Sequence, residues 1–111
     1  MRKRTSAVLL ALTIGAIAAL PVFAATPKIT GTVGPGFTIS MKKPTKAGKY
    51  TLVVSDKSSI HNFHLKGKGV NVMTSVPATG SKTFKITLAK GKYTFLCDPH
   101  PTSMKGSFTI R

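Results

Sequence analysis

Three side chains that can bind a metal ion lie within one short segment near the end of the chain. Cys97, His100 and Met104 supply a thiolate, an imidazole and a thioether, and Cys97 is the only cysteine of the 111 residues. Cys97 ends one run of alternating apolar and polar residues, and Met104 begins another. This pattern predicts two strands joined by a short loop that carries His100. Such a loop can bring the three side chains to one point, and Pro99 and Pro101 restrict its conformations.

A second imidazole is expected from the segment 60–65, which contains two histidines. His61 and His64 differ by three positions, so on a strand they point to opposite faces. His61 shares its parity with the apolar Phe63 and Leu65, and we therefore expect it to face the core and the metal. His64 shares its parity with polar neighbours and is predicted to lie at the surface. A bulge that reversed the parity would exchange the two roles.

Two imidazoles, one thiolate and a weak thioether are the ligands of a blue-copper site. Zinc also accepts Cys and His, but it favours a third His, another Cys or a carboxylate over a thioether. The chain has only two carboxylate side chains, Asp56 and Asp98. Asp98 follows Cys97, and we expect its side chain to point away, beside the ligands rather than among them. Nucleophilic catalysis by Cys97 would need a base, an orienting partner and a cleft, whereas this thiol is expected to be buried. The residues thus favour one copper ion and no enzymatic role.

The elements that position these residues read as short strands separated by Gly and Pro. Runs with a period of two are rich in Thr, Val, Ile, Tyr and Phe, and no stretch after residue 24 has a convincing helical period. Seven or eight strands at this spacing predict an antiparallel sandwich or barrel. We expect the apolar members of the runs, Phe37 among them, to build the core. The runs cover residues 37–41, 50–54, 84–88, 93–97 and 104–110.

The first 24 residues have the layout of a secretory signal peptide. Basic residues at 2–4 precede an uncharged, mostly apolar run at 7–20, and small apolar residues precede a cleavage point after Ala24. A transmembrane anchor is the alternative, but the apolar run is short for a bilayer span of about 20 residues. We therefore expect residues 1–24 to be removed and residues 25–111 to form one copper-binding domain in the periplasm or outside the cell, without stable membrane insertion.

The charge of the chain is strongly positive. There are 17 Lys and Arg residues against two Asp, a formal net charge of +15. One interpretation is a solvated surface that keeps the protein soluble, and another is attraction to an acidic partner or an anionic membrane. Nucleic acid is not expected, because the lysines are dispersed, arginine is almost absent and no stacking-aromatic motif is present.

Two segments of the sequence resemble the cupredoxin family. Residues 91–100, followed by 104–110, are similar to the C-terminal copper loop and last strand of plastocyanin and its relatives. The pair His61-Asn62 is similar to the family's first copper histidine and the asparagine beside it. The likeness extends over roughly residues 29–111, although outside the copper motifs it is a general β pattern.

The resemblance implies a Greek-key β-sandwich with copper near one end and one-electron transfer between Cu(I) and Cu(II). It also implies that His61, Cys97 and His100 are the equatorial ligands and that Met104 is axial. The loop between His100 and Met104 is one residue shorter than in plastocyanin, although loop length varies across the family.

Further roles follow from the resemblance alone. Asn62 would join the two ligand segments by hydrogen bonds. His100 would present an edge to solvent inside an apolar patch through which electrons pass, with Pro35, Pro99 and Pro101 as patch residues. Lysines stand where plant plastocyanin has acidic patches, so a partner protein is expected to carry negative charge.

Three functions are consistent with the sequence. The first is an exported, monomeric electron carrier that works with an acidic redox partner. The second is a copper-binding module that stores or delivers copper without electron transfer. The third is a metal-free domain whose basic face binds an acidic polymer or lipid.

Overall fold

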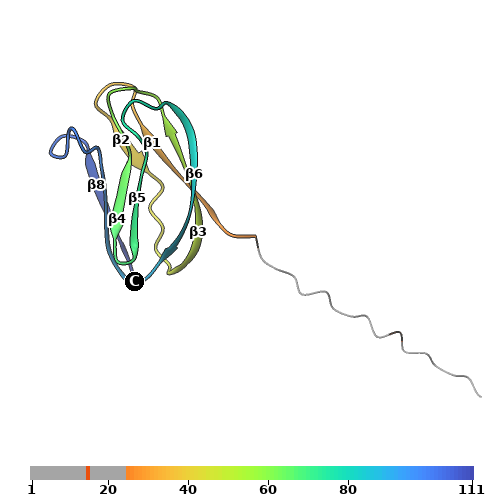
Figure 1. Ribbon diagram of the computed structural model, residues 1–111. Coiled ribbons are helices and arrows are strands. Elements are labelled where there is room, and N and C mark those ends of the chain that lie inside the picture. The colour runs from red at the N-terminus through yellow and green to blue at the C-terminus, as the bar shows by residue number, and fades with distance from the viewer. Residues whose placement is uncertain (1–14, 16–24) are drawn as a thin grey trace, which may run out of the picture.

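The computed structural model describes residue 15 and residues 25–111, and this part of the chain forms eight strands and no helix (Figure 1). The predicted signal peptide at 1–24 lies almost wholly outside the described residues. The strands are β1 (Lys28–Val33), β2 (Ile39–Met41), β3 (Gly48–Asp56), β4 (His64–Gly67), β5 (Val70–Met73), β6 (Gly80–Leu88), β7 (Gly91–Leu96) and β8 (Lys105–Ile110).

The strands form two four-stranded sheets that pack face to face. One sheet has the order β2-β1-β3-β6 and the other β5-β4-β7-β8. All pairs are antiparallel except β1 with β3, which run parallel. The chain passes between the sheets after β3, β5 and β6, as expected of a Greek-key sandwich. The predicted all-β sandwich of seven or eight strands is confirmed.

The core lies between the sheets and is built from the alternating apolar residues of the strands. Stacked aromatic pairs fill its centre, with Phe63 against Phe95 and Tyr93 against Phe108 at ring-centroid distances of 5.8 and 5.3 Å. Gly106 lets the ring of Phe95 approach its strand closely, since a Cβ atom at this position would lie 2.2 Å from the ring. The rigid core therefore extends along β7 and β8 up to the ends that carry the predicted ligands.

Phe37 is not part of this core, and the expectation that it would be is wrong. β2 begins only at Ile39, and the Phe37 side chain is 60% exposed. Gly34 and Gly36 adopt positive φ angles of 72° and 69°, a conformation that other residues rarely adopt. The chain therefore turns before the strand, and the alternation does not reach Phe37.

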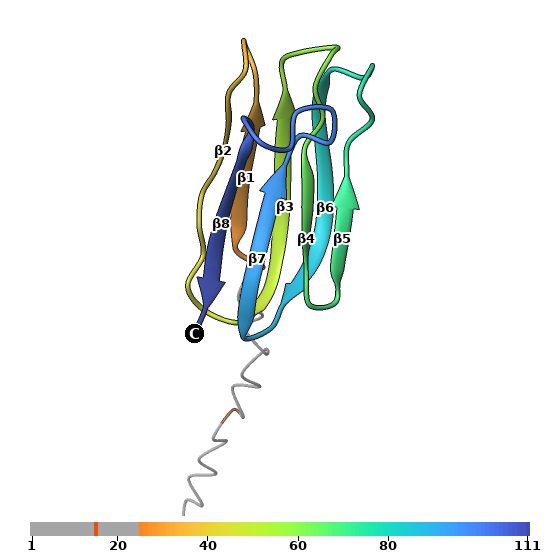
Figure 2. The ribbon, with the colours of Figure 1, turned by 90° about the vertical axis from the view of Figure 1, so that its left-hand side faces the viewer.

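Four loops lie at one end of the sandwich. Three of them surround the predicted ligands: residues 34–38 between β1 and β2, 57–63 before β4, and 97–104 between β7 and β8. The fourth, residues 74–79, joins β5 to β6 (Figure 2). The C-terminus and the β4–β5 turn lie at the other end. Both segments with predicted ligands, 57–63 and 97–104, are thus brought to the same end.

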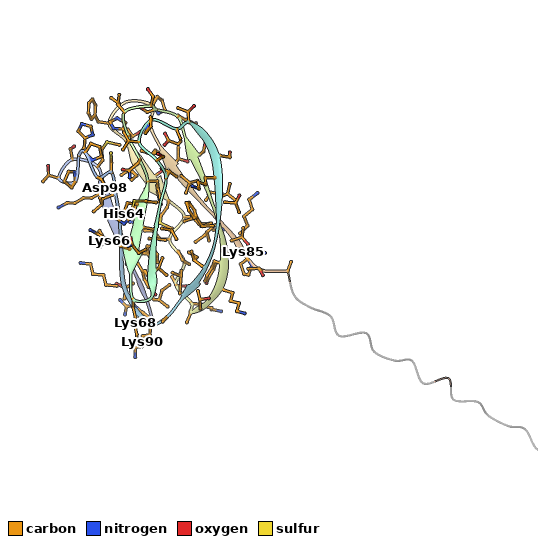
Figure 3. All side chains as sticks on the ribbon, viewed as in Figure 1. His64, Lys66, Lys68, Lys85, Lys90 and Asp98 are labelled. Atoms are coloured by element: carbon orange, nitrogen blue, oxygen red, sulfur yellow. The ribbon has the colours of Figure 1, made fainter. Side chains whose placement is uncertain are left out.

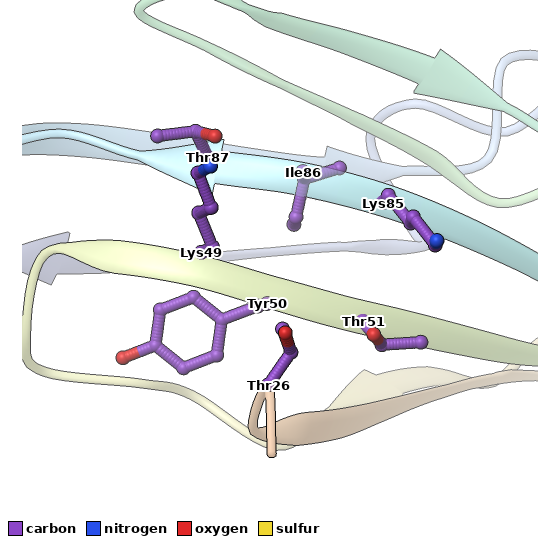
Figure 4. Close-up of a pocket in the computed structure, with 7 residues that line it drawn as sticks. All are labelled: Thr26, Lys49, Tyr50, Thr51, Lys85, Ile86 and Thr87. Atoms are coloured by element: carbon purple, nitrogen blue, oxygen red, sulfur yellow. The ribbon is translucent and has the colours of Figure 1, made fainter. Parts of the chain in front are cut away.

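Two other features bear on function. Among the described residues, none belongs to a helix long and apolar enough to cross a membrane. A shallow hollow lies between β3 and β6 and is lined by Lys49, Tyr50, Lys85 and Thr87, with Thr26, Thr51 and Ile86 (Figure 4). Because Lys49 and Thr87 lie at the end remote from the three loops, this hollow is separate from the predicted ligands.

Candidate metal centre

Three predicted ligands, His61, Cys97 and His100, converge at the loop end of the sandwich. The Nδ1 atoms of the two imidazoles are 3.1 Å apart, and each lies 3.7 Å from the Cys97 sulfur. The centre of a triangle with these three sides lies about 2.0 Å from every corner, close to the usual metal–nitrogen and metal–thiolate bond lengths. The donor atoms therefore fit one metal ion without rearrangement.

His61 is positioned by the loop that precedes β4. The Phe63 amide donates to Oγ1 of Thr74 at 2.8 Å, and the Thr74 amide donates to the Phe63 carbonyl at 2.9 Å. These bonds fix the chain two residues after His61, whose side chain is only 1% exposed. His61 lies before the strand rather than within it, so its inward direction results from this anchored loop and not from strand alternation.

The other ligand loop is closed by its own backbone. The Cys97 amide donates to the Met104 carbonyl, the His100 amide to the Cys97 carbonyl, and the Met104 amide to the His100 carbonyl, each at 3.0 Å. Cys97 and Met104 are completely buried, whereas His100 is partly exposed. The loop thus holds the thiol and the thioether inside the protein and leaves one imidazole at the surface.

Asn62 and Asp98 join the two ligand segments. The Asn62 side-chain amide donates to Oδ2 of Asp98 at 2.7 Å, and its Oδ1 accepts the Asp98 backbone amide at 2.8 Å. Asp98 therefore faces this pair of segments rather than pointing away. Burial by itself raises the pKa of Asp98, but hydrogen bonds from His64 and Asn62, with the charges of His64 and Lys66, outweigh it and lower the pKa.

His64 is buried, and the expectation of a surface histidine is wrong. Its Nδ1 lies 2.8 Å from Oδ1 of Asp98, and Figure 3 shows these two residues close together. Its Nε2 lies 2.5 Å from Oδ1 of Asn71. Strand alternation does not apply to residues 60–63, because β4 begins only at His64. The five residues from 61 to 65 are all buried, so burial does not alternate along this segment.

Phe37 is a neighbour of the ligands that the sequence analysis missed. Its ring meets the His61 and His100 rings edge-on, at centroid distances of 4.9 and 5.0 Å. The turn around Gly34 and Gly36 could have indicated that this residue leaves the strand pattern. Ile60, the residue before His61 in the chain, is also exposed, at 55%.

The predicted patch prolines, Pro35, Pro99 and Pro101, are all exposed. Each lies in a loop at the ligand end, close in sequence to Phe37 or His100. Their location is compatible with a surface patch around the imidazoles.

Most of the chain matches a known protein family. A sequence profile described as copper-binding proteins of the plastocyanin/azurin family matches residues 32–111. The chain belongs to the plastocyanin/azurin family. Copper is accordingly the cofactor of this cupredoxin, and His61, Cys97 and His100 form a cluster that can hold a single ion. A search among curated proteins found no match.

Solved structures share the fold of this cupredoxin. Auracyanin A, a "blue" copper protein from the green thermophilic photosynthetic bacterium Chloroflexus aurantiacus, is 19% identical with a TM-score of 0.51, over 76% of this chain and 98% of that one. Reduced rusticyanin is 20% identical with a TM-score of 0.51, over 76% of each chain. One chain from the structure of a heme-copper terminal oxidase dimer is 17% identical to this chain with a TM-score of 0.52. The match covers 78% of this chain and 66% of the oxidase chain.

Proposed function

We propose that this cupredoxin is an exported electron carrier in which His61, Cys97 and His100 hold one copper ion and Met104 is a weak axial ligand. The observation that carries the proposal is the triangle of donor atoms, whose centre lies at bonding distance from all three. Copper, when bound, supplies one-electron exchange between Cu(I) and Cu(II). The set of two imidazoles, a thiolate and a thioether is the one that tunes copper for this exchange.

The residues around the ligands support electron transfer because they hold the donor atoms in place beforehand. Backbone bonds close the loop from Cys97 to Met104, and Asn62 joins this loop to the segment of His61. A protein that fixes its ligands in this way limits the movement that accompanies a change of oxidation state. The complete burial of Cys97 also keeps water away from the thiolate.

The partly exposed His100 is the proposed exit for the electron. Phe37 packs against both imidazoles and is exposed, as is Ile60, which precedes His61 in the chain, and Pro35, Pro99 and Pro101 extend the apolar surface. Because Phe37 packs against both imidazoles, exposed apolar surface lies directly beside the ligands. We therefore propose a docking surface for a redox partner and no enzymatic activity.

The partner is proposed to be acidic. The domain carries 13 lysines, and they are spread over both sheets and the remote end, where Lys68 and Lys90 lie (Figure 3). Attraction to an acidic protein would speed association and make it sensitive to salt. We further propose that residues 1–24 are a signal peptide, that residues 25–111 are the mature monomer, and that it works in the periplasm or outside the cell.

An absorption spectrum with metal analysis of the mature protein tests the function. We expect one copper per chain, an intense visible band from the thiolate, and a reversible one-electron couple. Cys97→Ser, which keeps a small polar side chain, should lose the band. Copper without the visible band, or zinc in its place, would refute the proposal. Rapid transfer of Cu(I) to an acceptor protein would favour copper delivery instead of electron transfer.

A further inference from the structure

His64 is a buried histidine with an oxygen acceptor at each ring nitrogen. Nδ1 lies 2.8 Å from Oδ1 of Asp98, and Nε2 lies 2.5 Å from Oδ1 of Asn71. A neutral imidazole has one N–H donor and one bare nitrogen, and the bare nitrogen would repel a second acceptor. With the Asn71 amide oxygen facing the ring, both contacts are hydrogen bonds only when both nitrogens carry a proton. The geometry therefore corresponds to a positively charged imidazolium.

Asp98 has the hydrogen-bonding partners expected of a negatively charged carboxylate. Its Oδ1 faces His64, its Oδ2 accepts the Asn62 side-chain amide, and its backbone amide donates to Asn62. Each carboxylate oxygen therefore has a hydrogen-bonding partner. Asp98 is also the residue that follows Cys97 in the chain. Among the described residues, Asp56 is the only other acidic side chain, and it lies at the end of β3.

In the described part of the chain, the other charged side chains near Asp98 are lysines that it does not contact directly. Lys66 is the next charged residue along β4, and Lys105 of β8 pairs with Leu96 of β7, which itself pairs with His64. Both lysines are exposed to water, which screens their effect on the site. The His64 side chain is only 11% exposed and is in direct contact with Asp98, whose own side chain is 42% exposed, so the contact rather than exclusion of water makes His64 the dominant charge on this carboxylate.

We propose that His64 is a positively charged positioning residue that anchors the Cys97-Asp98 segment to β4 and β5 and cancels the charge of Asp98 beside the copper. This inference rests on the proposed function. A lone carboxylate so close to the ligands would favour the oxidised ion and lower the reduction potential. The imidazolium offsets that effect, and its second bond to Asn71 keeps the ring in place.

The charge of His64 is tested first without copper. In a long-range ¹H–¹⁵N spectrum of the metal-free protein at neutral pH, both ring nitrogens of His64 should give signals of protonated nitrogen. In Asp98→Asn, the His64 ring should become neutral, with one bare nitrogen. A bare nitrogen on His64 in the wild-type protein would overturn the proposal.

The effect on the site is tested by the reduction potential of the copper-loaded protein. His64→Gln leaves the carboxylate uncompensated and should lower the potential. Asp98→Asn, in which the ring loses its charge together with the carboxylate, and the double variant should both stay close to the wild-type value. Lys66→Gln is the matched control, since it removes one positive charge from the same strand without touching Asp98, and its shift should be smaller.

The outcomes separate this inference from the proposed function. Equal potentials for His64→Gln and Lys66→Gln, or a double variant that keeps the lowered potential of His64→Gln, would overturn the role of His64. Absence of a reversible copper couple in the wild-type protein would instead overturn electron transfer, while the nitrogen signals would still decide the charge of His64. If His64→Gln does not fold, Asp98→Asn and the wild-type spectrum decide.

Discussion

The anchoring of the His61 loop by Thr74 leads to a prediction that needs no metal. Thr74 follows β5 and is 4% exposed, and its Oγ1 accepts the Phe63 amide at 2.8 Å. Its backbone carbonyl also accepts the Asn62 side-chain amide at 3.3 Å. Replacing Thr74 by Val keeps the shape of the side chain and removes only the acceptor. The substitution therefore isolates the hydrogen bond that fixes this loop.

The expected loss follows from the burial of the Phe63 amide. A buried donor left without an acceptor costs about 1–3 kcal/mol, and we expect the free energy of unfolding to fall by about 2 kcal/mol. For a domain of this size each kcal/mol corresponds to roughly 4–8 °C, so the melting temperature should fall by roughly 8–16 °C. Thr74→Ser keeps the oxygen and loses one methyl group, which should cost roughly 0.8 kcal/mol.

Urea unfolding of the metal-free protein, followed by circular dichroism, gives these free energies. Hydrogen exchange adds a local measurement, because the Phe63 amide should lose protection in Thr74→Val and keep it in Thr74→Ser. A Val variant as stable as the wild-type protein, with the Phe63 amide still protected, would refute the reasoning. So would a Ser variant less stable than the Val variant.

Four further outcomes are expected. Cys97→Ala should abolish the visible band and lower the melting temperature of the protein in the presence of copper, as absorption and calorimetry would measure. Met104→Leu should retain copper and raise the reduction potential, because a weak donor to the oxidised ion is lost, and an unchanged potential would mean that Met104 is not axial. Gly106→Ala should cost about 1–3 kcal/mol in urea unfolding, because its Cβ would lie 2.2 Å from the Phe95 ring, whereas alanine at the exposed Ser107 should have little effect. Asp98 has a pKa below its unfolded value, so it stabilises the fold above about pH 4 and this contribution is lost as the pH falls through the folded pKa. Unfolding of Asp98→Asn should lack that acid-side dependence, and an identical pH profile would contradict it.

The strand pattern was predicted well where strands are regular. The runs at 84–88 and 93–97 lie in β6 and at β7, with inward residues such as Ile86, Phe95 and Cys97 buried. A period of two survives there because each strand is paired over its length and one face meets the core. The same reasoning failed at Phe37, where the chain turns before its strand begins.

Predicting the surroundings of the ligands was harder because they lie in loops. His61 was expected to face inward, which is correct, but the argument placed it on a strand that begins three residues later. The same assumption put His64 at the surface. In a loop, the direction of a side chain depends on which distant groups satisfy the backbone, as Thr74 does for Phe63. Alternation along the chain carries no information about such bonds.

The sequence by itself determined the β class and the loop from Cys97 to Met104, since short spacing and a period of two act over a few residues. Only the tertiary structure decided how closely His61 approaches the sulfur of Cys97, 36 positions away. It also decided that Phe37 contacts both imidazoles and that His64 lies between Asp98 and Asn71. The physical reason is the same in each case: these contacts join different loops and sheets, so their geometry arises only when the strands that carry them are packed.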